Sequence, residues 1–375
     1  MFYGLDVHKE FIQVCRLSPD GRRRREFRIA ATREALEAFA RRLTPDDQVA
    51  LEATFHSWAI HAILAPAAGR VVVVNALQVK AIAHAKIKTD KVDARTLAQL
   101  LRVDFLPAVQ LPDDEAWALR QLISHRRLLI KQQTAAKNTI RSLLNRRLLA
   151  LPEGVTPFAR KTRRWMHELA LPATERFVLD NALELLEQIE ARVAAADAQL
   201  RAHASITESA KLLMTIPGIN ITVAIALLAA IGDIQRFPTP PKLAAYFGLV
   251  PKVRQSAGRC HHGTITKAGP CTARSLAIEA AQVLARSSSP LTATYWRVRH
   301  KRGHNAAVTA LARKLITIVW HLLHKREPYR YAPAARTRDK LRRVTPERTR
   351  TTRVPHSLDR VYAEAGLPPL PPPSP

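Results

Sequence analysis

The chain is poor in cysteine, in acidic residues and in long apolar runs, and each shortage excludes a class of protein. Three cysteines among 375 residues, widely spaced at Cys15, Cys260 and Cys271, cannot form a disulfide framework, which indicates a reducing compartment. Residues 212–232 carry no charge, but Pro217-Gly218 interrupts them and leaves a run too short to cross a bilayer. We therefore expect this stretch to be core, and the protein to be cytoplasmic with no membrane partner.

The shortage of acidic residues leaves a large excess of positive charge. Lys and Arg number 59 against 31 Asp and Glu, a formal net charge of +28. A polyanionic partner accounts for such an imbalance, and nucleic acid is the first candidate. Anionic lipid would require a lipidation signal or an amphipathic anchor, and the opening residues 1–6 contain neither.

The N-terminal part shows strand and helix signals in the order β-β-β-α-β-α-β. The expected strands cover residues 2–8, 11–17, 26–30, 48–53 and 70–75, and the expected helices cover 33–43 and 57–64. A turn at Ser18-Pro19-Asp20-Gly21 joins the second and third strands, and Thr32 caps the first helix. This order is typical of RNase H-like folds, so we expect an α/β domain of that kind over 1–110.

Four carboxylates in this domain indicate a metal site. Asp6 and Glu52 each lie in an apolar strand, where an unpaired carboxylate would be costly to desolvate unless a cation or hydrogen-bond donors meet it. The first and fourth strands are neighbours in an RNase H-like sheet, so both side chains would face one point. Asp90 and Asp93 are three apart and would share one face of a helix. Four hard oxygen donors suit Mg²⁺, and phosphoryl transfer uses two such ions.

Plainer interpretations of these residues stay open. Asp90 and Asp93 stand beside Lys88, Lys91 and Arg95, so they could form a salt-bridged helix start. His8, His56 and His84 lie near the same elements, and a solvated or hydrogen-bonded histidine is the default interpretation of each.

The rest of the chain reads as helical. Residues 111–208 carry two apolar seams with the spacing of a coiled coil, one of Leu122, Leu129, Ala136 and Leu143, the other of Leu186, Ile189, Val193, Ala196 and Leu200. Over 209–326 we expect a mainly helical domain that opens on a helix-hairpin-helix-like unit at Ile216-Pro217-Gly218-Ile219, or an ordinary Pro-Gly turn in a bundle. Residues 327–375 are basic and proline-rich, which predicts a disordered tail.

Several motifs resemble the DEDD transposases of the IS110 insertion-sequence family. In the first domain they are Gly4-Leu5-Asp6-Val7-His8-Lys9, Glu52-Ala53-Thr54 and Lys88-Thr89-Asp90-Lys91-Val92-Asp93-Ala94. In the C-terminal domain they are Ile216-Pro217-Gly218-Ile219, Tyr246-Phe247-Gly248-Leu249-Val250-Pro251, Gln255-Ser256-Ala257-Gly258 and Gly263-Thr264-Ile265-Thr266-Lys267-Ala268-Gly269. The resemblance implies a RuvC-like nuclease domain joined to a second transposase domain. It covers most of residues 1 to 325.

The resemblance also assigns a nucleophile. In the family a serine of this segment attacks DNA and becomes covalently linked to it, and Ser256 holds that position here. This chain departs from the family pattern at Ala257 and Pro270. Arg254, Arg259 and Lys267 surround Ser256 in sequence and could hold a scissile phosphate, with Lys88 and Arg95 as further nucleic-acid contacts. Alternatively the serine merely hydrogen-bonds in a phosphate-gripping loop; zinc at Cys260, His261, His262 and Cys271 has the wrong spacing.

Together these observations predict a transposase or recombinase that cuts and rejoins insertion-sequence DNA. The four carboxylates would bind Mg²⁺ and Ser256 would attack the strand. By resemblance the partners are DNA, a structured noncoding bridge RNA and further copies of the chain in a dimer or tetramer, in a bacterial cytoplasm at the nucleoid. The rival predictions are a hydrolytic RuvC-like junction nuclease, in which water attacks, and a non-enzymatic nucleic-acid-binding relic.

Overall fold

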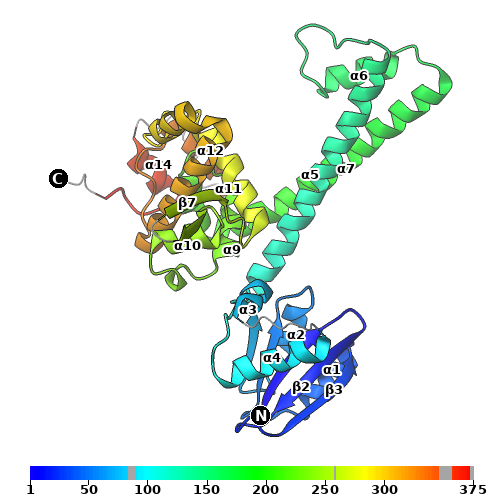
Figure 1. The fold of residues 1–375 in the computed structure, drawn as a ribbon. Coiled ribbons are helices and arrows are strands. Elements are labelled where there is room, and N and C mark those ends of the chain that lie inside the picture. The colour runs from blue at the N-terminus through cyan, green and yellow to red at the C-terminus, as the bar shows by residue number, and fades with distance from the viewer. Residues whose placement is uncertain (83–88, 257–258, 346–356, 372–375) are drawn as a thin grey trace. The chain divides into compact units, whose positions relative to one another are not determined.

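The chain folds into two compact units, Met1–Leu111 and Pro112–Pro375 (Figure 1). The computed structural model describes residues 1–82, 89–256, 259–345 and 357–371. The first unit contains a mixed sheet with helices, and the second is mostly helical, as the sequence predicts.

A five-stranded sheet in the order β3-β2-β1-β4-β5 forms the first unit. The first three strands, β1 (Phe2–Val7), β2 (Phe11–Leu17) and β3 (Arg24–Ala30), form the predicted antiparallel meander. The last two, β4 (Gln48–Glu52) and β5 (Arg70–Val74), run parallel to β1. The fourth strand therefore lies beside the first, as the proposed carboxylate site requires.

Helices cover both faces of this sheet. Residues Tyr3, Leu5 and Val14 bury one face against α1 (Arg33–Ala40) and α2 (Ser57–Leu64). The opposite face packs on α3 (Ala76–Ile82) and α4 (Asp90–Arg102) through Ala50, Val72, Val79, Leu97 and Leu101. Side chains alternate between the faces of a strand, so the even-numbered residues of β1 face α4.

Gly4 allows α4 to lie directly on β1. A Cβ atom at position 4 would stand 2.0 Å from the carbonyl oxygen of Ala94 and 2.6 Å from the amide nitrogen of Ala98. Both of these alanines are fully buried. The contact is backbone against backbone, and it fixes the height of α4 above the strand that carries Asp6.

We expect Gly4→Ala to lower the free energy of unfolding by about 2–3 kcal/mol, because the new methyl group must push α4 away from β1. Urea denaturation followed by circular dichroism measures this loss. Gly263→Ala is the matched control, since a Cβ there would meet its nearest atoms at 3.7 Å, an ordinary contact. Equal stabilities of the two variants would contradict the close approach.

Two long helices, α5 (Asp114–Arg146) and α7 (Ala173–Ile206), pack side by side in the second unit (Figure 1). Apolar residues of both helices form a shared core that includes Ile140, Leu144, Leu179 and Leu183. Ion pairs join the helices as well: Arg126 Nε lies 2.5 Å from Asp197 Oδ1, and Arg147 Nη2 lies 2.5 Å from Glu175 Oε1. The short helix α6 (Arg160–Glu168) packs on the same core through Met166.

The remaining helices of the second unit enclose a large apolar core. It includes residues of α8 (Glu208–Met214), α9 (Ile221–Ile231), α10 (Pro240–Tyr246), α11 (Cys271–Leu284) and α12 (Thr292–Lys325). A short 3-10 helix, η1 (Ile234–Arg236), and a hairpin of β6 (Pro251–Ser256) and β7 (Arg259–Ile265) complete the domain. The charge-free stretch 212–232 runs through α8, the Pro217-Gly218 turn and α9, inside this core.

The Pro217-Gly218 turn is packed rather than presented to solvent. Gly218 has φ +88°, and a Cβ there would lie 2.3 Å from the carbonyl oxygen of Ala280 in α11. The Lys340 ammonium donates hydrogen bonds to the carbonyl oxygens of Ile216 (2.9 Å) and Ile219 (3.1 Å). These bonds use the carbonyl oxygens of the turn, whereas a phosphate would bind backbone N–H groups, so the helix-hairpin-helix interpretation stays a prediction.

Helix α12 is long and apolar enough to cross a membrane by length and composition alone. Half of its most apolar window is buried inside the protein, and Leu311, Leu315 and Val319 are core residues. Gly303 has φ +78° and interrupts the helical backbone. These features are those of the core helix of a folded domain.

The expectation of a disordered tail from residue 327 onward is wrong for the described residues there. They include two helices, α13 (Ala334–Arg342) and α14 (Leu358–Glu364). Tyr362 is fully buried and donates a hydrogen bond of 2.6 Å to the carbonyl oxygen of Tyr329. Burial lowers the pKa of Lys340 to about 8. Sparse apolar side chains anchor this basic segment to the core, which its overall composition does not indicate.

Candidate active site

Asp6 lies at the end of β1, on the face that carries α4. It follows Gly4 by two residues, so its side chain points to the same side of the sheet. The carboxylate is only 15% exposed. Burial raises the pKa of Asp6, and the negative charges of Asp93 and Asp90 raise it further, while His8 opposes them. Burial and the neighbouring acids disfavour the charged form of Asp6, and a bound cation would stabilise that form.

Helix α4 supplies Asp90 and Asp93 from its first turn. Thr89 caps the helix by accepting a hydrogen bond of 3.3 Å from the Val92 amide. The contact between Gly4 and Ala94 fixes where α4 lies along β1. Because Ala94 packs on Gly4, the helical turn that precedes Ala94 lies over Asp6. Negative side chains are also favourable at a helix N-terminus, where the helix dipole is positive.

Glu52 is the last residue of β4, the parallel neighbour of β1. The two strands are in register from Phe2 opposite Gln48 to Leu5 opposite Leu51. Continuing this register by one residue places Glu52 beside Asp6, on the α4 side of the sheet. The three elements that carry the predicted carboxylates therefore meet at one edge of the sheet.

The residues at this edge fit a divalent cation. Ligand atoms of Asp6, His8 and Asp90 all lie within 4.8 Å of one another. Two of these donors are carboxylates, and Asp93 is close enough to influence Asp6. This is the one such group found among the side chains that the structure describes, so the alternative of zinc near Cys260 and Cys271 gains no support.

His8 and Arg28 also belong to this site; His8 stands in the same motif as Asp6, where a solvated or hydrogen-bonded histidine is the default interpretation, and no sequence pattern indicates Arg28. His8 Nε2 lies 3.1 Å from Asp6 Oδ2 and 3.4 Å from Asp90 Oδ1. Arg28 Nη2 lies 3.5 Å from Asp90 Oδ2. Arg28 Nε donates a hydrogen bond of 2.9 Å to Oε1 of the buried Gln13, which pairs with Asp6 in the β1–β2 register. Cross-strand register alone brings Arg28 to this site, since Asp6 pairs with Gln13 and Gln13 pairs with Arg28.

Two family models match the chain. A model described as transposase, and named for the DEDD motif and IS110, matches residues 3–147. The model of the IS116/IS110/IS902 transposase family matches residues 210–297. The first match contains every carboxylate of the candidate site, and the second contains the β6–β7 hairpin.

Curated relatives agree with these models. The transposase for insertion sequence element IS1111A of Coxiella burnetii is 32% identical over 251 residues, which are 65% of this chain and 68% of that protein. The chain belongs to the IS110 family of transposases. A Pseudomonas aeruginosa protein named "Probable family 20 transposase" is 29% identical, over 65% of this chain and 75% of its own. The pilin gene-inverting protein of Moraxella bovis is 27% identical, over 69% and 74%.

The family shows that this transposase is an enzyme acting on DNA, and it implies use of a divalent metal. The acidic edge of the first unit is where the structure offers such a metal a set of ligands.

Ser256 of the transposase is the last residue of β6 and stands opposite Arg259 of β7 in the hairpin register. Two hydrogen bonds hold the base of the hairpin. The Thr266 amide donates one of 2.9 Å to the Val250 carbonyl oxygen, and Arg274 Nη1 donates one of 2.6 Å to the Ala268 carbonyl oxygen. Gly269, at φ +69°, lies against the Tyr246 carbonyl, and a Cβ there would approach it to 2.0 Å. The base of the hairpin therefore packs on the helical core, and Pro270 precedes the first residue of α11.

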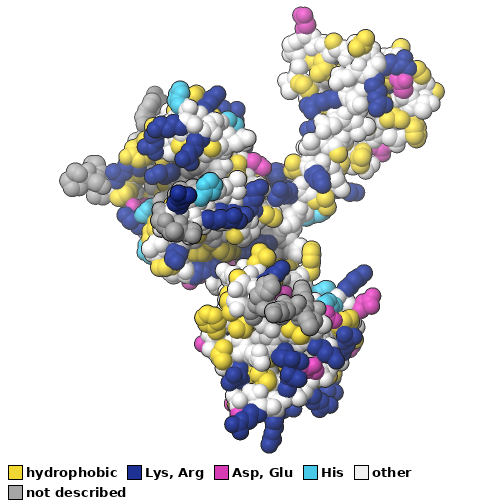
Figure 2. Space-filling view, in the orientation of Figure 1, with side chains coloured by type: hydrophobic (Ala, Val, Ile, Leu, Met, Phe, Trp, Pro, Cys, Tyr) yellow, Lys and Arg dark blue, Asp and Glu magenta, His cyan; other side chains and the backbone are white. Residues whose placement is uncertain are grey.

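The predicted nucleic-acid contacts have different surroundings. Arg254, Arg259 and Lys267 are exposed on or beside the hairpin. Arg95 instead donates 2.8 Å to Glu26 and is a partner in an ion pair. Lys88 and Ala257 lie outside the described residues. Figure 2 shows Lys and Arg side chains gathered over the visible face of the second unit, with few acidic ones among them.

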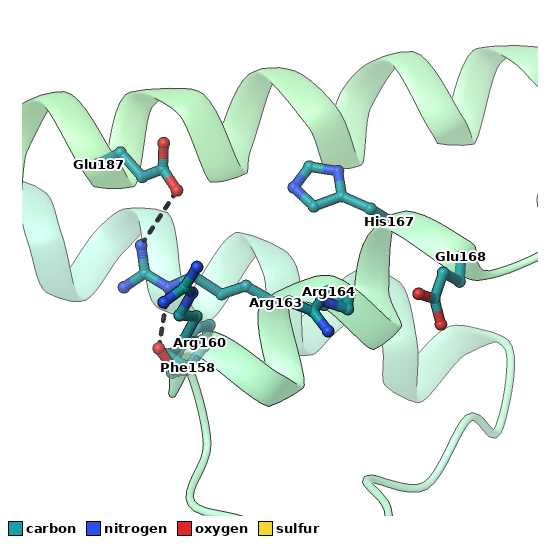
Figure 3. A pocket seen from close by; sticks show the side chains of 7 residues that line it. All are labelled: Phe158, Arg160, Arg163, Arg164, His167, Glu168 and Glu187. Carbon is teal, nitrogen blue, oxygen red and sulfur yellow. Dashed lines mark hydrogen bonds and ion pairs between the residues drawn. The ribbon is translucent and has the colours of Figure 1, made fainter.

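A further basic surface lies on α6. Arg160, Arg163, Arg164 and His167 line an open cavity of about 650 Å³ together with Phe158, Glu168 and Glu187 (Figure 3). Arg163 is neutralised, since it lies 2.7 Å from Glu190 and 3.7 Å from Glu187, and it donates 2.8 Å to the Phe158 carbonyl. Arg160 and Arg164 are exposed at the cavity rim.

Proposed function

We propose that the transposase cuts and rejoins insertion-sequence DNA with Mg²⁺ held by Asp6, Glu52, Asp90 and Asp93. The observation that carries this proposal is the convergence of Asp6, Asp90 and the end of β4 on one edge of the sheet, with Asp6 and Asp90 ligand atoms within 4.8 Å. Hard oxygen donors suit Mg²⁺. When bound, the cations would polarise the scissile phosphate and stabilise the leaving oxygen.

The protein's own residues would position the strand and keep the carboxylates charged. Gln13 is 1% exposed and supports Arg28 beside Asp90. His8 bridges Asp6 and Asp90. In this proposal Arg28 offsets the charge of Asp90 in the absence of metal and turns toward DNA phosphates when the metal is bound, while His8 hydrogen-bonds to Asp6. Catalysis of phosphoryl transfer otherwise consists largely of positioning and charge stabilisation.

In the same proposal Ser256 attacks the DNA. Its hydroxyl would give up its proton as the oxygen forms an ester with the phosphorus, and the DNA oxygen on the other side of that phosphorus would take up a proton and leave as a hydroxyl. Attack by the hydroxyl of a second strand would then break the ester, restore the serine and seal the new junction without ATP. The name of the Moraxella bovis relative supports such a cycle, since inverting a gene requires cut ends to be rejoined.

Domain roles follow from this proposal. Residues 1–110 would form the RuvC-like nuclease, 111–208 a coiled-coil arm, and 209–326 the serine-bearing domain, with residues 327–375 contributing basic contacts. Exposed arginines on the hairpin and on α6 would bind phosphates, whose neutralisation dominates such affinity. Dimers or tetramers would bring serine and carboxylates together at the nucleoid.

The proposed target guide is a structured bridge RNA encoded by the element. Recombination between a plasmid bearing the element's junction and a plasmid bearing the target should depend on this RNA. We expect omission of the RNA to abolish recombinant plasmids, counted by sequencing across the new junctions, and re-addition to restore them. Recombination at the same level without RNA would contradict guidance.

A further inference from the structure

The face of the sheet opposite to the carboxylates carries an arginine-lined cavity. It has a volume of about 520 Å³ and lies at the start of β1, at the other end of the strand from Asp6. Three arginines and three aromatic rings line it, Arg16, Arg25, Arg42, Tyr3, Phe27 and Phe39, together with the acids Asp46 and Asp47. The transposase chemistry described above uses none of these residues.

Two of the arginines face one another without a neutralising partner between them. In the sheet register Tyr3 stands opposite Arg16, and Arg16 stands opposite Arg25, so all three belong to one row on one face. Like charges directly opposite on neighbouring strands are destabilising. A row of this kind is stabilised when an anion lies on it.

One hydrogen-bond donor of the row has no partner. Arg16 donates to the Tyr3 hydroxyl, but its Nε is buried and has no hydrogen-bond partner among the described residues. A buried donor without a partner is costly. Of the two acids in the lining, Asp47 already forms an ion pair with the N-terminal amine (2.9 Å) and accepts a hydrogen bond from the Thr44 amide (2.8 Å).

The walls of the cavity specify more than a bare anion. Phe27 is half-buried beside the Arg25 guanidinium, which stands 6.0 Å from the centre of its ring. Phe27 and Tyr3 both contact Phe39, with ring centres 6.2 Å and 5.6 Å away. Arginines recognise phosphate through paired hydrogen bonds, and aromatic rings stack on nucleobases. The cavity volume is within the range of small-ligand sites.

We propose that this cavity binds an unpaired nucleotide of a nucleic-acid strand, with its phosphate on Arg16, Arg25 and Arg42 and its base against Phe27. The proposal rests on the fact that transposases of this family act on DNA, and it requires neither Ser256 nor the metal. An RNA loop and an unpaired DNA segment offer the same chemistry, so both are tested.

The test measures binding of single-stranded octamers to the full-length protein in EDTA, where the carboxylate site is unloaded. Two probes are used, one ribose and one deoxyribose, each phosphorylated at the 5′ end, fluorescent at the 3′ end and carrying one photoreactive thio-pyrimidine. We expect Arg25→Gln/Arg42→Gln to weaken anisotropy-detected binding by about tenfold. Irradiation of the wild type should crosslink the probe to Tyr3, Phe27 or Phe39, located by mass spectrometry.

The matched control is Arg23→Gln/Arg41→Gln, which removes the same charge from exposed arginines outside the cavity. This control should change the affinity for the octamer less than threefold, because neither arginine would form a paired hydrogen bond with the bound phosphate. Because Arg16 and Arg25 repel each other, Arg25→Gln should not lower the melting temperature, so the variant stays folded. A preference for one probe identifies the strand. Equal losses in both double variants, crosslinks elsewhere, or competition by inorganic phosphate as strong as by the octamer would each overturn the proposal.

Discussion

Asp6→Asn is expected to lower DNA strand cleavage by about 10³-fold or more, a loss of about 4 kcal/mol of transition-state stabilisation. The amide keeps the size of the side chain and removes the negative charge that a divalent cation requires. Asp6 is the most buried of the acids whose exposure the structure records at this edge, and burial already raises its pKa. The charge it carries is therefore of use mainly to a bound cation.

The measurement is the rate of cleavage of labelled junction DNA in Mg²⁺, with DNA binding followed separately in Ca²⁺. Glu10→Gln is a matched control, because Glu10 is an exposed acid of the same unit with no place at the acidic edge. The control should cleave at the wild-type rate. If Asp6→Asn cleaved normally while still folded, the acidic edge would not be the catalytic site, and a non-enzymatic relic would be favoured.

Ser256→Ala is expected to abolish the covalent protein–DNA product and to reduce recombination to background. The hydroxyl is the proposed attacking group, so its removal leaves metal binding intact but gives the strand no protein acceptor. A denaturing gel of radiolabelled DNA detects the linked species directly. Thr264→Ala, on the same hairpin and exposed, should leave that species unchanged.

The opposite outcome is equally informative. Cleavage that depends on Mg²⁺, proceeds normally in Ser256→Ala and never leaves protein on the DNA would identify water as the attacking group. The transposase would then act as a hydrolytic RuvC-like nuclease at this step, and joining would require another activity.

The architecture of the first unit could be predicted from local signals. Its strands alternate or are wholly apolar, and turn and cap residues such as Thr32 stand at their boundaries. The carboxylates were recognisable because Asp6 and Glu52 are anomalous in apolar strands. Their approach to Asp90 needed one further fact, the order of the strands, which the fold type supplied.

What could not be predicted depends on contacts between distant segments. The row of Asp6, Gln13 and Arg28 exists only in the sheet register, so no local pattern places Arg28 at the site. The basic, proline-rich composition of the tail predicts disorder, but Tyr329 and Tyr362 pack in the core of the second unit through contacts that composition does not indicate. Nor does the Pro217-Gly218 pattern indicate that Lys340, more than a hundred residues away, donates hydrogen bonds to the carbonyl oxygens of Ile216 and Ile219.

The bare seam between Gly4 and the alanines of α4 restricts how this enzyme can diverge. The backbones of strand and helix meet directly at Gly4, and Ala94 and Ala98 are fully buried beside it, so added volume at any of the three positions displaces the helix that holds Asp90 and Asp93. An enlargement at one position can be tolerated only if another shrinks, and Gly4 has no atoms left to give up. Mutational drift should therefore spare these three positions together.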